Sequence, residues 1–146
     1  MLHLARVCCE IRSTLVVSGR MASPLIGLLQ APDREALEAL LHESVRFHSP
    51  VADYDGRQDV AHLFCLIATV VQDIQPTREL EDETATTTFM SGVVEGNPVQ
   101  GVLDERYDQH ARLVDATLML RPFATLRIAA ARMAAALDAE PLPSTR

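Results

Sequence analysis

The sequence predicts an α+β fold in a single domain. Apolar residues recur at helical spacing before residue 76, whereas residues 77–122 are rich in Thr and Val and are divided by short turns. Helices followed by a run of antiparallel strands are typical of this fold class, in which the helices cover one face of a curved sheet. The 146 residues suffice for one domain with its own hydrophobic core.

Three helices are expected in the first half of the chain. The first is expected over residues 24–30, with Ser23 as its N-cap and a proline in its first turn. The second is expected over residues 33–45, where leucine and valine recur at helical spacing. The third is expected to begin near Arg57 and to end at Pro76, because proline cannot continue a helix.

Strands are expected mainly in the second half. A short strand at residues 45–48 precedes the third helix, because apolar and polar residues alternate there. Three longer strands follow, separated by tight turns, at residues 84–94, 99–107 and 113–120. The tight turns indicate an antiparallel meander. A last helix is expected from Phe123, since apolar residues recur every three or four positions after it.

The two ends of the chain differ in character from the domain expected at residues 21–140. Residues 1–20 contain apolar stretches broken by charge, which makes a poor signal peptide, and Met21 opens a segment that resembles an ordinary protein start. We interpret residues 1–20 as a poorly ordered extension or as a misassigned start. Residues 141–146 contain two prolines and are interpreted as a flexible tail.

The composition excludes several classes of function. All 13 basic residues are arginines, so Schiff-base chemistry on lysine is excluded. The net charge of −7 and the scattered arginines argue against nucleic-acid binding, and no apolar run is long enough to span a membrane. The three cysteines follow no metal-binding spacing, so we expect no metal, no other cofactor and a cytoplasmic location.

Short motifs give the chain a resemblance to a known family. The segment FHSP at residues 47–50 is followed by GR at residues 56–57, and LRP at residues 120–122 precedes the last helix. In this order of elements, residues 24–136 resemble the nuclear transport factor 2-like superfamily, and within it the SnoaL-like, or polyketide cyclase-like, group. The resemblance implies a cone-shaped half-barrel, in which a bent antiparallel sheet wraps around the N-terminal helices. It also implies a C-terminal helix and an internal pocket at the open end.

The fold alone does not identify the function, since the superfamily includes ketosteroid isomerases, polyketide cyclases, epoxide hydrolases, dehydratases and non-enzymatic binders. In the ketosteroid isomerases a general-base Asp precedes the proline that ends the first strand. Ser49 stands there, and Leu25 lies near the position of their phenol donor. The Arg-x-Asp of the epoxide hydrolases is matched only superficially at residues 106–108. Counted back from the turn, the positions of the epoxide hydrolase Arg-x-Asp motif correspond to residues 101–103 of this chain. The second Asp of those enzymes corresponds to a position near Leu118.

Two residues are candidate acid or base groups. Glu105 shares its strand alternation with Leu103, so it is expected to face an apolar pocket that would raise its pKa. If the alternation runs the other way, Asp104 and Arg106 take the inward positions. His48 is the second candidate. Its neighbour Phe47 is expected to point inward, and adjacent residues of a strand point to opposite faces, so the alternative for His48 is an ordinary surface histidine.

These observations lead to two hypotheses. In the first, the protein binds an apolar small molecule in the cone, with isomerase, cyclase, dehydratase or hydrolase chemistry left open. Its ligand-binding candidates are Phe47, Ser49, Tyr54, Leu103 and Leu118. In the second, the protein is a non-catalytic dimerisation or protein-interaction module whose open sheet face pairs two subunits. A homodimer is expected in either case.

Overall fold

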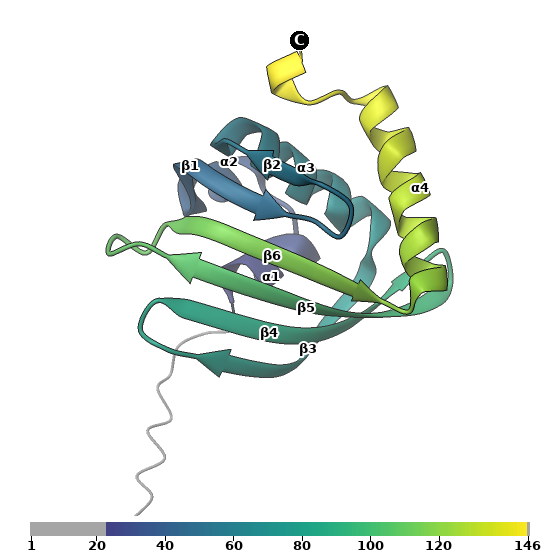
Figure 1. Cartoon of the computed structure of the whole chain (residues 1–146), viewed down its shortest axis with the longest axis horizontal. Helices are drawn as coiled ribbons and strands as arrows, with labels where there is room; N and C mark the ends of the chain where they lie inside the picture. The colour runs from purple at the N-terminus through teal and green to yellow at the C-terminus, as the bar shows by residue number, and fades with distance from the viewer. Residues whose placement is uncertain (1–22, 146) are drawn as a thin grey trace, which may run out of the picture.

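The structure is a computed structural model that describes residues 23–145 (Figure 1). The extension predicted for residues 1–20 lies outside the described residues. Within them the elements follow in the order α1 (Pro24–Gln30), α2 (Arg34–Leu40), β1 (Leu41–His48), β2 (Asp53–Asp55), α3 (Arg57–Val70), β3 (Gln72–Glu81), β4 (Ala85–Val94), β5 (Asn97–Tyr107), β6 (Leu113–Arg121), α4 (Phe123–Ala139) and the 3₁₀ turn η1 (Pro143–Thr145).

The six strands form one bent sheet in the order β2-β1-β6-β5-β4-β3. Helices α1, α2 and α3 lie against one face of this sheet, and α4 crosses one end of it (Figure 1). This arrangement confirms the α+β prediction and the cone-like sheet with a C-terminal helix. The sheet differs from the prediction in that β1 and β6 run parallel, so it is mixed and not antiparallel throughout.

The second helix is shorter than the sequence predicts, and β1 is longer. Helix α2 ends at Leu40, and the chain is already extended from Leu41 onward. Leu41 and Val45 are both fully buried, and they lie four residues apart in the strand. A spacing of four returns to the same face in a helix and in a strand alike, so the pattern did not distinguish them.

The third helix is also shorter, because a strand occupies its predicted end. Helix α3 stops at Val70, and β3 begins at Gln72 and runs through Pro76. Proline is tolerated there because β3 is the edge strand of the sheet, where one side needs no backbone donor. The register with β4 shifts next to Pro76, as expected for a proline within a strand pair.

The C-terminal end is bound to α3. The Ser144 hydroxyl and backbone N–H donate to the two carboxylate oxygens of Asp59, at 2.5 and 3.0 Å. Near the end of α4, the His62 ring donates from Nε2 to the carbonyl oxygen of Glu140 at 2.7 Å. These contacts keep α4 close to α3, and the candidate site lies between these two helices.

Candidate functional site

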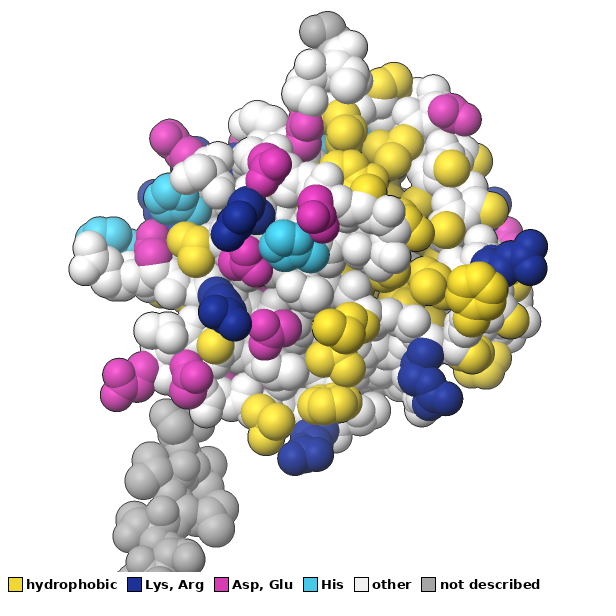
Figure 2. All heavy atoms as spheres, viewed as in Figure 1, with side chains coloured by type: hydrophobic (Ala, Val, Ile, Leu, Met, Phe, Trp, Pro, Cys, Tyr) yellow, Lys and Arg dark blue, Asp and Glu magenta, His cyan; other side chains and the backbone are white. Residues whose placement is uncertain are grey.

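An apolar cavity of about 170 Å³ lies between α3, α4, the inner face of β6 and the loop after β1. Figure 2 shows apolar side chains gathered between the sheet and α4, on the side where the cavity lies. Its wall is formed by Phe47, Ser49, Pro50, Val51, Tyr54, Leu63, Ile67, Val70, Val71, Leu118, Leu120, Leu126, Ala129, Ala130, Met133, Ala134 and Leu137.

The loop after β1 shapes one side of the cavity. The Ser49 hydroxyl donates to the carbonyl oxygen of Ala52 at 2.8 Å and accepts from the Ala52 backbone N–H at 3.0 Å. These bonds close a tight turn, so β2 folds back beside β1 and Tyr54 pairs with Phe47. Their rings stack with centroids 6.4 Å apart, and Phe47 also packs on Phe64 at 4.8 Å.

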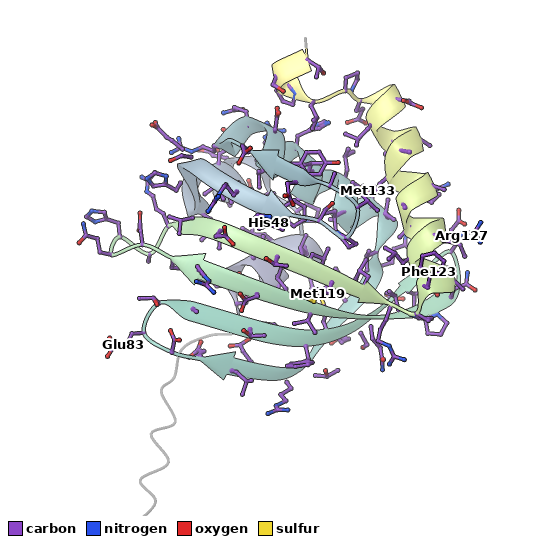
Figure 3. All side chains as sticks on the ribbon, viewed as in Figure 1. His48, Glu83, Met119, Phe123, Arg127 and Met133 are labelled. Carbon is purple, nitrogen blue, oxygen red and sulfur yellow. The ribbon has the colours of Figure 1, made fainter. Side chains whose placement is uncertain are left out.

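Helix α4 supplies the opposite wall. Its cavity residues recur every three or four positions, which places them on one side of the helix: Leu126, Ala129, Ala130, Met133, Ala134 and Leu137. Figure 3 labels Met133 on this helix beside the sheet. The start of α4 is attached to β5, because the Thr125 hydroxyl donates to the carbonyl oxygen of Pro98 at 3.1 Å.

The structure places four of the five ligand-binding candidates in this wall: Phe47, Ser49, Tyr54 and Leu118. Leu103 is buried in the core and does not line the cavity. The binding role of all five stays a prediction. Sequence reasoning missed the contribution of α4, although the spacing of Leu126, Met133 and Leu137 was visible. An apolar face on a helix indicates packing without saying whether a side chain or a ligand fills the space beside it.

Glu105 points into the interior, as the strand alternation predicts, and its exposed fraction is 0%. The Tyr107 hydroxyl donates to its Oε1 at 2.6 Å, while Oε2 has no hydrogen-bond partner among the described residues. Burial raises the pKa of Glu105 to about 7. Burial also raises the pKa of Tyr107 above its ordinary value. A carboxyl with this pKa can exchange a proton near neutral pH.

Glu105 nevertheless lies outside the cavity wall. The buried polar groups of this region gather at the start of α1, where Glu79 Oε2 accepts from the Ser23 backbone N–H at 3.2 Å and lies 3.4 Å from the Thr88 hydroxyl. The carboxyl of Glu79 further raises the pKa of Glu105. The apolar cavity is thus separate from the buried Glu105 and the half-buried Glu79 beside it.

His48 lies on the other face of the sheet, where its side chain bridges three strands (Figure 3). Its Nδ1 is 2.9 Å from Asp53 Oδ1 on β2, and its Nε2 is 3.2 Å from Asp115 Oδ2 on β6. These two hydrogen bonds raise the pKa of His48. Arg46 Nε is 3.7 Å from the same Asp115 oxygen. His48 does not line the cavity, and its catalytic role stays a prediction.

Residues 23–145 were also considered as ligands of a metal ion and as membrane-spanning segments, with the following result for each. No group of three or more His, Cys, Asp or Glu side chains in this range is arranged to hold a metal ion. None of the helices described is long and apolar enough to cross a membrane.

Comparison with solved structures identifies similar folds. A steroid delta-isomerase from Pseudomonas aeruginosa matches with a TM-score of 0.73 and 29% identity, over 77% of this chain and 85% of that one. A protein with a cystatin-like fold from Silicibacter pomeroyi matches with a TM-score of 0.74 and 22% identity, over 80% and 87%. An NTF2-like protein from Cytophaga hutchinsonii matches with a TM-score of 0.57 and 11% identity, over 70% and 88%. No protein-family model matches the sequence, and no curated protein does.

The raised pKa of Glu105 predicts a specific pH dependence of stability. The folded state holds the proton more tightly than the unfolded chain, whose glutamate pKa is near 4.5. The contribution of this proton to the free energy of unfolding is therefore fully present below pH 4.5 and is lost as pH rises towards 7. The expected loss is about 3 kcal/mol. Glu105→Gln keeps an acceptor for Tyr107 without ionising, so it should lose less stability between roughly pH 5 and pH 8 in urea unfolding.

Asp104→Asn is the matched control for this prediction. Asp104 is adjacent in sequence, but its side chain is 37% exposed and lies on the opposite face of β5. Asp104 is the smallest of the causes that raise the pKa of Glu105, so Asp104→Asn should leave most of the pH dependence of the wild type in place. Equal losses of stability in the wild type and in Glu105→Gln would show that Glu105 ionises normally in the folded protein.

Proposed function

The chain has the fold of the nuclear transport factor 2-like superfamily, and on this premise we propose that it binds an apolar small molecule in the cavity beside α4. The observation that carries the proposal is the chemistry of the wall, where all side chains except those of Ser49 and Tyr54 are apolar. A concave apolar site with very few polar groups is how small-molecule sites are usually built. The cysteine pattern of the sequence supports a cytoplasmic location for this activity.

The geometry supports binding more strongly than acid–base catalysis. A general base must lie within hydrogen-bond reach of the proton that it removes, and neither Glu105 nor His48 lines the cavity. Ser49, at the position where the ketosteroid isomerases have their base, has its hydroxyl engaged in the turn. Isomerase, cyclase, dehydratase or hydrolase chemistry is the alternative, and the 29% identity to a steroid delta-isomerase favours the first of these.

Filling the cavity should abolish binding. Ala130 lines the cavity from α4, so Ala130→Leu places a branched side chain into the space that a ligand would occupy. We expect neutral apolar compounds of one to four rings to include some that raise the melting temperature of the wild type. Their affinity for Ala130→Leu should fall by roughly tenfold or more, because the site is overpacked.

Ala131→Leu is the matched control, since Ala131 is the next residue on the same helix and is exposed outside this cavity. It should bind the same compounds as the wild type. If no compound shifts the wild type, or if Ala130→Leu and Ala131→Leu bind equally well, the cavity is not the binding site.

A second candidate function is dimerisation through the outer face of the sheet. Phe89, Val102 and Met119 lie side by side across β4, β5 and β6, and Met119 is 61% exposed. Leu80 on β3 is a further exposed apolar residue of this sheet, 49% exposed. An apolar surface that crosses several strands is more often an interaction site than an accident of composition, and a second copy of the chain would cover it.

Met119→Lys tests this candidate, because a charge in the middle of the apolar surface has to be buried if two copies pair there. We expect the wild type to be a dimer by light scattering coupled to size exclusion, and Met119→Lys to be a monomer. Ala135→Lys adds the same charge at an exposed position on α4 and should remain dimeric. A wild type that stays monomeric at high concentration would rule this function out.

A further inference from the structure

The volume of the cavity limits the size of its ligand. The space between its walls is about 170 Å³, in a pocket that is open to solvent on one side. An apolar cavity of about 150 Å³ in a protein interior holds one benzene molecule. The space beside α4 is therefore suited to one ring, or to a short branched chain of similar volume. A molecule of four fused rings exceeds it.

The wall offers one free polar side chain. Ser49 and Tyr54 are the two polar residues that line the cavity. The Ser49 hydroxyl already donates to the Ala52 carbonyl oxygen and accepts from the Ala52 backbone N–H, so it is engaged in the turn. Tyr54 lines the cavity and stacks on Phe47, and among residues 23–145 its side chain takes part in no hydrogen bond. A phenol can both donate and accept, so this group is suited to one oxygen atom of a ligand.

The ring that carries this hydroxyl is positioned by one stacked ring and by the attachment of β2 to β1. Phe47 stacks on the Tyr54 ring with an interplanar angle of 22°, and Phe47 is itself fully buried against Phe64. Asp53, the residue before Tyr54 on β2, is bonded to His48 on β1. A polar group on a fixed ring discriminates between ligands better than one on a mobile side chain, because less conformational freedom is lost on binding.

The wall carries no charged side chain. A carboxylate or an ammonium ion in the cavity would lose its hydration without gaining a partner, so charged ligands are disfavoured. We propose that the cavity binds a neutral single-ring or short branched molecule with one oxygen, such as a phenol, an alcohol or a cyclic ketone, and that the Tyr54 hydroxyl binds this oxygen. This inference rests on the proposed function, because it assigns the class of ligand to the same cavity.

The experiment compares four probes by isothermal titration calorimetry: p-cresol, toluene, 4-methylbenzoate and a neutral four-ring steroid ketone. We expect p-cresol to bind roughly tenfold more tightly than toluene, because it can pair with Tyr54. The charged benzoate and the steroid should bind more weakly than toluene or not at all. Tyr54→Phe should lower the affinity for p-cresol to that for toluene and leave toluene binding unchanged. That unchanged binding also shows that the variant keeps an intact cavity.

Tyr107→Phe is the matched control, since the chain has two tyrosines and Tyr107 donates its hydroxyl to Glu105 outside the cavity wall. It should retain the preference for p-cresol over toluene, whatever it does to stability. If the steroid binds more tightly than p-cresol, the size limit is wrong while the proposed function stands. If toluene and p-cresol bind equally to the wild type, the role of Tyr54 is wrong. If neither these probes nor the wider set of apolar compounds bind, the proposed function fails together with the inference.

Discussion

The packing of Phe47 against Phe64 is the contact on which the candidate site depends. It joins β1 to α3, and the stacking of Tyr54 on the same ring adds β2 to the group. Phe47 is fully buried and also lines the cavity, so the same residue belongs to the core and to the cavity wall. Aromatic side chains combine a large buried area with a fixed shape, which allows this double role. The opposite wall of the cavity is formed by the apolar face of α4.

The strand alternation that turns Phe47 inward also explains why the acidic candidates do not share its site. Glu105 faces the interior of β5, but its neighbours there are Tyr107 and the polar groups at the start of α1. His48 immediately follows Phe47 and therefore points to the opposite face. A side chain that faces the interior of the sheet therefore does not necessarily line the cavity. The cavity occupies the end of the sheet that α4 crosses, and Glu105 lies at some distance along the strand from that end.

Much of the fold could be predicted from the sequence, and the errors arise where a local pattern is ambiguous or where residues far apart in sequence decide the structure. The meander of β4, β5 and β6, the helices α1 and α4, and the inward position of Glu105 all follow from alternation, spacing and caps. Where a spacing of four fits both element types, as for Leu41 and Val45, the local pattern left the boundary open. The parallel pairing of β1 with β6 depends on residues far apart in sequence, which no local pattern records. The cavity wall depends in the same way on α3 and α4 being brought together.

Similar folds can differ in their ligands because the volume of the cone is set by side chains and not by the backbone. The steroid delta-isomerase shares the path of the chain over most of its length, but the space beside α4 depends on the bulk of residues such as Leu118, Leu120 and Met133. Larger side chains at these positions reduce the cavity without moving a strand, since interiors are closely packed. The backbone therefore accounts for the similarity to solved structures, and in the proposed function the wall residues determine the class of ligand. A neutral wall with one phenol favours recognition of a single oxygen over acid–base chemistry.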